Sequence, residues 1–252
     1  MTTANFYDRM SPFYHLVYDD WEAAIKRQAD QLDSLIQEFW GDQVCTVLDV
    51  SCGIGTQALG LAQHGYRVTA SDLSAAAIER AKREALQRRI KIDWSVADMR
   101  QAYSHHQRQF DVVISCDNAV PHLLTDDDIL TAFRQFYTCT KPGGGCLITV
   151  RDYDQVVREG TQVKPPGLRV ENGVRYLVFQ VWEFKGAIYD LSMYFVQDGG
   201  EGDSVPTQVM RTQYYAVSPK TLMTLLAEAG FSDVARLDDR FYQPVIVGRK
   251  KA

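Results

Sequence analysis

Cysteine is scarce and unpaired in this 252-residue sequence. The five cysteines are scattered singly, with no Cys-x-x-Cys pair and an odd total. This usage argues against a disulfide-stapled secreted domain and against a zinc site built from paired thiolates. We therefore expect a reducing, cytoplasmic location and no metal centre.

Basic tracts and long apolar runs are also missing. The net charge is −5, and the cluster RRIK that begins at Arg88 is too short to attract a nucleic acid. The N-terminal stretch MTTANFYDRMSPFYH has no apolar signal core, and no run approaches the length of a membrane span. We therefore expect neither a nucleic-acid nor a membrane partner. Hydrophobic and charged fractions of 46% and 23% are those of an ordinary globular chain.

Apolar runs of strand length alternate with helical segments along most of the chain. Strands are expected at 44–50, 66–72, 91–98, 110–118, 146–154, 234–239 and 243–250, and helices at 19–39, 55–64, 75–87, 125–141 and 218–231. This rhythm predicts an α/β fold, a Rossmann-like and mostly parallel sheet with helices on both faces. Residues 1–252 are expected to form a single domain.

Two segments depart from the alternation. Residues 1–40 are expected to form an N-terminal helical cap. From about residue 160 to residue 217 the chain is dense in aromatic residues and valine, with turn signals at Asn172-Gly173, Lys185-Gly186 and Asp198-Gly199-Gly200. This pattern predicts an antiparallel β-meander inserted into the domain as a lid.

A glycine loop follows the first expected strand. Gly53-Ile54-Gly55-Thr56-Gln57-Ala58 satisfies the weak dinucleotide pattern G-x-G-x-x-G/A. On that pattern alone a nicotinamide- or flavin-dependent dehydrogenase is allowed. The two glycines could also serve only to make a tight turn between strand and helix.

Acidic residues at three successive strand ends narrow the choice of ligand. Asp49 precedes the glycines, where a carboxylate suits a cationic ligand and would repel a pyrophosphate. Asp72 is placed to accept both ribose hydroxyls, and Asp98 to accept from an adenine amino group while Met99 packs on the ring. Three acidic residues, with no basic residue in the glycine loop, favour a ligand that is a positively charged nucleoside and carries no phosphate. The expected ligand is S-adenosylmethionine, with S-adenosylhomocysteine as the product.

These residues resemble class I S-adenosylmethionine-dependent methyltransferases from Asp49 to Asp152. In that family the loop reads acid-x-Gly-x-Gly-x-Gly, and Ser51 replaces the first glycine here. The resemblance implies a seven-stranded sheet whose last strand is antiparallel. It also places Leu73 and Cys116 beside the donor.

Two further stretches, SCDNAVPHLL and TVRDYD, resemble the glycine and sarcosine N-methyltransferase branch. The resemblance implies that Asn118 helps to place the acceptor and that Arg151 binds an amino-acid carboxylate. This chain departs from the branch at Asp117, at Val120-Pro121 and at Asp152. The general site is therefore better supported than glycine as the acceptor.

Two of these side chains have alternative interpretations. Arg151 could bind an anionic ligand, or it could form an internal ion pair with Asp152 or Asp154. His122 could be a general base, although a lone histidine before two leucines is more often a structural hydrogen-bonding group.

Tyrosines complete the expected site. The opening FYDRMSPFYHLVYDDW resembles the family's Tyr-Asp…Tyr-Asp start, which implies that Tyr7 or Tyr14 reaches the methionyl carboxylate, with Arg27 as a possible additional charge. Plain packing of an N-terminal helix is the alternative. Among the aromatic residues of the meander, Tyr214 and Tyr215 adjoin the final helix and are preferred for the acceptor site.

The expected function is methyl transfer to the amine of a small molecule, a glycine- or sarcosine-like amino acid. The alternatives are O-methylation of a small metabolite and a non-catalytic S-adenosylmethionine-binding protein, with a dehydrogenase as the third. We expect a monomer or a homodimer.

Overall fold

The larger of two sheets has seven strands in the order β10-β11-β5-β4-β1-β2-β3. A computed structural model describes residues 2–200 and 205–252. The strands of this sheet are β1 (Thr46–Asp49), β2 (Arg67–Asp72), β3 (Asp93–Val96), β4 (Phe110–Ser115), β5 (Thr140–Thr149), β10 (Ser232–Leu237) and β11 (Val245–Arg249). All neighbours pair in parallel except β11, which is antiparallel to both β5 and β10. The predicted seven-stranded fold with an antiparallel last strand is confirmed.

Helices cover both faces of this sheet, as predicted. They are α2 (Trp21–Trp40), α3 (Thr56–Gln63), α4 (Ala75–Gln87), α5 (Ala102–His106), α6 (Asp126–Cys139) and α7 (Pro219–Glu228). Because side chains alternate along a strand, Val47 and Val112 pack with α2, α3 and α4, whereas Leu48 and Val113 pack with α5, α6 and α7. None of the helices in the described residues is long and apolar enough to cross a membrane.

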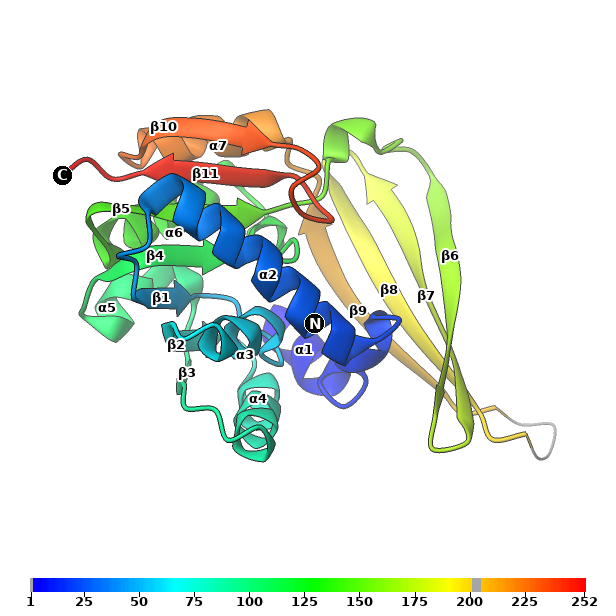
Figure 1. Ribbon diagram of the computed structural model, residues 1–252. Coiled ribbons are helices and arrows are strands. Elements are labelled where there is room, and N and C mark those ends of the chain that lie inside the picture. The colour runs from blue at the N-terminus through cyan, green and yellow to red at the C-terminus, as the bar shows by residue number, and fades with distance from the viewer. Residues whose placement is uncertain (1, 201–204) are drawn as a thin grey trace.

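The inserted segment forms a second sheet of four antiparallel strands, in the order β6-β7-β8-β9. They are β6 (Thr161–Glu171), β7 (Val174–Lys185), β8 (Ile188–Asp198) and β9 (Thr207–Tyr215). Gly173 and Gly186 take the positive φ angles of 78° and 71° that the two tight turns require. Figure 1 shows this lid as a curved sheet standing beside the large one. Residues 201–204 of the predicted lid lie outside the described residues.

The N-terminal segment lies between the two sheets (Figure 1). It consists of α1 (Thr3–Met10) and a short 3₁₀ turn, η1 (Tyr14–Val17), ahead of α2. Arg9 of α1 donates to the Val209 carbonyl oxygen of the lid at 3.1 Å. On the other side, the Asp8 carboxylate accepts from the Ser74 hydroxyl at 2.6 Å and from the Ala76 amide, at the start of α4. The segment therefore joins the lid to the large sheet.

Two local expectations need correction. The helix predicted over 125–141 ends at Cys139, and Pro142 with its glycines lies inside β5 rather than in a helix-stopping loop. Position 145 has no room for a side chain, because a Cβ there would lie 2.2 Å from Nε1 of Trp40. Helix α5 was not predicted, because five residues are too few for a helical period to be recognised.

Asp111 ties the N-terminal ends of β1, β4 and β5 together. Its carboxylate accepts from the Thr46 amide at 2.8 Å, the Thr46 hydroxyl, the Cys45 amide and the Lys141 ammonium. Burial alone would raise the pKa of Asp111, but the hydrogen bonds from Lys141 and Thr46 outweigh burial and lower it to about 2.

We expect Asp111→Asn to lower the free energy of unfolding by about 2 kcal/mol at neutral pH, the equivalent of the pKa shift. Because the folded-state pKa is depressed, this contribution is complete above the unfolded pKa and is lost as the pH falls from about 4 to about 2. Urea unfolding of both proteins at pH 7 and at pH 3 measures it. A difference that does not shrink at pH 3 would contradict this account.

Candidate active site

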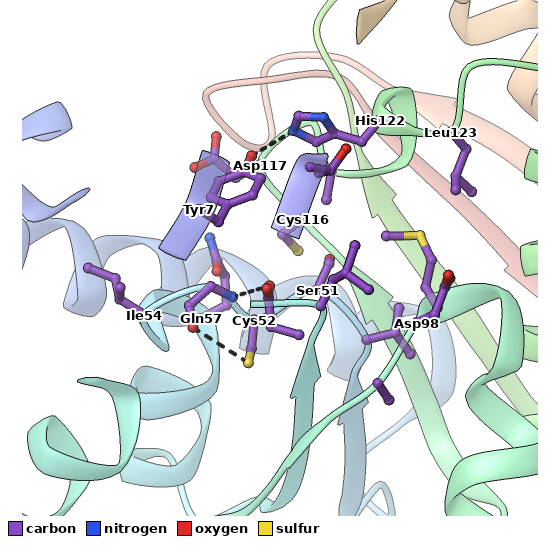
Figure 2. A pocket seen from close by; sticks show the side chains of 18 of the residues that line it. Tyr7, Ser51, Cys52, Ile54, Gln57, Asp98, Cys116, Asp117, His122 and Leu123 are labelled. Atoms are coloured by element: carbon purple, nitrogen blue, oxygen red, sulfur yellow. Dashed lines mark hydrogen bonds between the residues drawn. The ribbon is translucent and has the colours of Figure 1, made fainter. Parts of the chain in front are cut away.

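A cavity of about 290 Å³ opens at the C-terminal ends of β1, β2, β3 and β4. This is the edge at which open α/β sheets bind their ligands. Its lining includes Tyr7, Tyr14, Tyr18, Ser51, Gly53, Asp72, Leu73, Asp98, Met99, Cys116, Asp117 and His122. Figure 2 shows Tyr7 and His122 on one side, facing the loop of Ser51 and Cys52 and the strand end at Asp98. Most residues predicted to bind a donor therefore lie together, whereas Arg27, Asp49 and Gly55 do not line the cavity.

The two glycines of the loop serve different purposes. Gly53 has a φ of +53°, and a Cβ there would lie 3.1 Å from the Tyr14 ring, so its backbone faces the cavity. Gly55 has a φ of +97° and begins α3. A Cβ at Gly55 would lie 3.0 Å from the Trp94 ring, so this glycine permits close packing rather than ligand contact.

Asp72 is held in place by the loop. Its two carboxylate oxygens accept from the Gly53 amide and the Ser74 amide, each at 2.8 Å. Burial raises the pKa of Asp72 above its usual value, although these hydrogen bonds oppose the shift. The carboxylate retains further acceptor capacity on the cavity side, and the neighbouring Leu73 is partly exposed at the cavity rim.

Asp49 is fully buried behind the loop. One oxygen accepts from the Ser51 amide at 3.1 Å, and the other has no hydrogen-bond partner among the described residues. Burial, with a smaller contribution from Asp72, raises the pKa of Asp49 to about 7. A buried carboxylate oxygen without a partner is costly, and a cationic ligand nearby would remove part of that cost.

The adenine side of the predicted pocket contains an arginine that sequence reasoning missed. Arg100 pairs with Asp98 at 2.7 Å and with Asp128 at 2.9 Å, and all three residues line the cavity beside Met99. Burial raises the pKa of Asp98, but Arg100 outweighs burial and lowers it. Asp98 is thereby kept ionised and able to accept one further hydrogen bond.

Tyr7 and His122, which are half-buried, line the roof of the cavity, and the buried Tyr214 contacts both. The Tyr7 hydroxyl lies 2.7 Å from Nε2 of His122 and 3.3 Å from the Tyr214 hydroxyl. The rings of His122 and Tyr214 lie 3.9 Å apart. Burial lowers the pKa of His122 to about 3, so the imidazole is neutral at physiological pH and holds Tyr7 rather than acting as a base.

Asn118, which was predicted to help place the acceptor, is buried and does not line this cavity. Its buried amide oxygen accepts from the Arg151 backbone amide at 3.0 Å, and its amide nitrogen donates to the Tyr153 hydroxyl at 2.9 Å. Its φ of 62° turns the chain sharply after β4. Asn118 therefore positions the backbone of Arg151.

Arg151 lies at the C-terminal end of β5, in a second cavity beneath the lid. Its guanidinium donates to the Tyr189 hydroxyl at 3.3 Å and lies 4.5 Å from the centre of the Trp182 ring. The ion-pair alternative is wrong for both candidates. Asp152 pairs with Arg236 at 2.6 Å, and Asp154 pairs with Arg158 at 3.1 Å.

Two further predicted residues lie outside both cavities. Arg27 is exposed on α2, because the helical period turns it away from the buried Ala24 and Gln28. Tyr215 is on the opposite face of β9 from Tyr214, since strand residues alternate. Tyr214 also lines neither cavity, but its hydroxyl lies 3.3 Å from that of Tyr7, which lines the first.

Tyr18 and Asp117 were missed as lining residues. The Tyr18 hydroxyl donates to Asp117 at 3.0 Å across the cavity wall. Asp117 follows β4 just as Asp49 and Asp72 end β1 and β2, so its position at a strand end was an available signal. The described residues contain no cluster of side chains suited to a metal ion.

The chain is similar to known methyltransferases. Residues 47–144 match the family model described as "Methyltransferase domain". The glycine/sarcosine N-methyltransferase of Parasynechococcus marenigrum is 28% identical over 71% of this chain and 67% of that protein. The ubiquinone biosynthesis O-methyltransferase of Klebsiella pneumoniae is 33% identical over 39% of each chain.

Solved structures share the whole fold. DesVI of Streptomyces venezuelae superposes with a TM-score of 0.79 at 20% identity, covering 99% of both chains. CalS10, an amino pentose methyltransferase of Micromonospora echinaspora solved with S-adenosylmethionine, superposes with a TM-score of 0.77 at 18% identity, covering 90% of this chain and 92% of that one. Residues 47–144 are therefore a methyltransferase domain, and the curated relatives and the sheet with its antiparallel last strand support a class I S-adenosylmethionine-dependent methyltransferase.

Proposed function

We propose that the chain transfers a methyl group from S-adenosylmethionine to the amine of a small molecule whose carboxylate is held by Arg151. One observation carries the acceptor half of this proposal. The Arg151 guanidinium lies among aromatic rings beneath the lid, and no carboxylate of the described residues is within ion-pairing distance. A desolvated guanidinium requires an anionic partner, and its planar fork matches a carboxylate.

The first cavity fits the donor. The unpartnered Asp49 oxygen suits a nearby cation, and the backbone of Gly53 is bare on the cavity side. Asp72 would accept from the ribose hydroxyls, Asp98 from the adenine amino group, and Met99 would pack on the ring. Tyr7 and Tyr14 would border the methionyl group. The finding that curated relatives include glycine/sarcosine N-methyltransferases supports an amine acceptor for this site.

Methyl transfer requires the protein mainly to place the donor and the acceptor next to each other. When bound, the sulfonium supplies an already activated methyl group. Arg151 would hold the acceptor by its carboxylate, and Tyr7 with the buried Tyr189 and Tyr214 would exclude water from the path between donor and acceptor. Desolvation beside a positive charge disfavours the ammonium form of the acceptor. No base is therefore needed, which agrees with the low pKa of His122.

O-methylation is the competing reaction, because an O-methyltransferase is among the curated relatives. A panel of small amines and their hydroxylated counterparts, assayed by mass spectrometry for the gain of a methyl group, tests the proposal. We expect products from carboxylate-bearing amines. Products from hydroxylated acceptors alone would overturn the amine proposal, and donor binding without any product would support a non-catalytic role.

The first variant concerns the ribose contact. We expect Asp72→Ala to weaken the binding of S-adenosylhomocysteine by about 1–3 kcal/mol, because a hydrogen bond to a charged group is lost. Calorimetry measures the affinity. Asp93→Ala, on the neighbouring β3 and outside the cavity, is the matched control and should leave the affinity unchanged. Equal affinities for all three proteins would place the ribose elsewhere.

The second concerns the charge of Asp49. With a folded-state pKa of about 7, Asp49 is protonated in the folded state at pH 6 and ionises as the pH rises to 8. A cationic donor favours the ionised form. S-adenosylmethionine should therefore gain affinity over that range relative to the uncharged thioether of S-adenosylhomocysteine, by up to about tenfold for each unit by which it lowers that pKa.

Dialysis with the two labelled ligands at pH 6, 7 and 8 gives this ratio directly. Asp49→Asn should make the ratio independent of pH. A ratio that is constant in the wild-type protein would mean that Asp49 does not sense the sulfonium.

The third concerns the acceptor. Arg151→Lys keeps the charge but loses the planar fork. We expect KM to rise for a carboxylate-bearing amine, whereas its uncharged amide, which does not use the fork, should change little and donor affinity should stay intact. Values of kcat/KM for the matched acid and amide, in both proteins, decide the matter. Equal losses for the two acceptors would remove the carboxylate-binding role.

A further inference from the structure

The cavity beneath the lid is strongly cationic in a chain whose net charge is −5. It measures about 540 Å³ and is bordered by Arg151 from the large sheet and by β6 and β7 of the lid. Its charged lining residues are Arg151, Lys164, Arg169 and Asp19. Three cations and a single carboxylate therefore face the same space, which is the charge pattern of an anion-binding site.

The edge strand β6 has an unusual distribution of side chains. Val163, Leu168 and Val170 are exposed on its outer face, with more than half of each side chain in solvent. Lys164 and Arg169 lie on the inner face and line the cavity. Inward-pointing charges are one way in which edge strands avoid pairing with other chains, but here they also line a cavity that Arg151 shares.

A bulge makes this arrangement possible. Lys164 and Arg169 are five residues apart, and on a regular strand they would point to opposite faces. The register shifts between Lys164 and Gly167, where one extra residue of β6 opposes β7. The extra residue restores both cations to one face. The bulge is thus the local feature that brings Lys164 over the cavity together with Arg169.

The cations differ in their partners. Arg169 is neutralised by Asp19 at 2.6 Å and also donates to a backbone carbonyl oxygen. Lys164 donates only to the Gln162 amide oxygen at 2.8 Å and lies 4.0 Å from the centre of the Trp182 ring, which Arg151 also contacts. Among the described residues no carboxylate pairs with Lys164. Burial and the nearby Arg151 together lower the pKa of Lys164, so the two charges repel each other across the cavity.

The volume of the cavity, like its charge, favours an acceptor with more than one anionic group. Cavities of about 300–1,000 Å³ hold ligands far larger than the smallest amino acids, and this one lies within that range. A single carboxylate on Arg151 would leave Lys164 without a partner. A second anionic group, on a longer acceptor, would pair with it.

We propose that Lys164 is a specificity-determining residue and that the acceptor is an amine bearing two anionic groups, one held by Arg151 and the other by Lys164. This inference rests on the proposed function and names the substrate class of that site. The second group is a carboxylate or a phosphate ester, because an ammonium binds either as a point charge.

Binding tests the proposal separately from turnover. Calorimetry in the presence of S-adenosylhomocysteine compares aspartate with asparagine, and O-phosphoserine with serine. The proteins are wild type, Lys164→Gln, Lys164→Arg and Lys185→Gln. Lys185 ends β7 on the exposed outside of the lid, where it pairs with Asp190, and it is the matched control. Mass detection of methylated product is run on the same four acceptors.

We expect the wild-type protein to bind the acid of at least one pair about tenfold more tightly than its neutral partner, which corresponds to about 1.4 kcal/mol. The pair that shows the preference identifies a carboxylate or a phosphate. Lys164→Gln should abolish the preference without weakening the neutral partner, whereas Lys164→Arg and Lys185→Gln should retain it.

No preference in the wild-type protein, or an equal loss for acid and neutral partner in Lys164→Gln, would overturn the inference. A preference that depends on Lys164 with no methylated product from any acceptor would uphold the anion site and defeat the proposed function. The two failures are therefore distinguishable.

Discussion

The Asp72 carboxylate joins the two chain segments on which the proposed donor site depends. It accepts from the Gly53 amide of the glycine loop and from the Ser74 amide at the start of α4. One buried carboxylate thus fixes the distance between the first and second β-α connections. It also accepts hydrogen bonds from two backbone amides that would otherwise have no partner. The loop can be open and bare of side chains toward the ligand because its other side is anchored in this way.

The N-terminal segment extends the same arrangement to the lid. Asp8 accepts from the Ser74 hydroxyl and so holds α1 against α4, while Tyr7 reaches His122 and Tyr214. The cavity roof is therefore assembled from three distant parts of the chain. A roof of tyrosines hydrogen-bonded to one another, with a neutral histidine among them, excludes water without introducing a charge that would compete with a cationic donor.

The charges that line the two cavities are mostly of opposite sign. On the donor side the polar lining is mostly acidic, and its one arginine, Arg100, is paired with Asp98 and Asp128. On the lid side the charges are mostly basic, and two of them lack a carboxylate partner among the described residues. A cationic donor and an anionic acceptor would each be drawn to its own side, which is a physical basis for binding them in the correct orientation.

The sequence by itself determined the large sheet, its helices except α5 and most of the residues that line the proposed donor cavity, because these depend on local patterns. Apolar runs, a glycine loop and acids at strand ends are each contained in a few consecutive residues. Asp49 and Gly55 were recognised by the same patterns, yet they support the cavity from behind rather than line it, since neighbouring residues of a turn face different ways.

The tertiary structure decided what depends on packing between distant segments. Only the tertiary structure showed that Asn118 contacts Arg151 and Tyr153, which lie more than thirty residues away in the sequence. Tyr214 and Tyr215 were separated by strand alternation. The position of Lys164 beside Arg151 depends on a bulge in β6 and on how the lid meets β5. Neither is encoded in a local pattern, since a register shift of one residue exchanges the two faces of a strand.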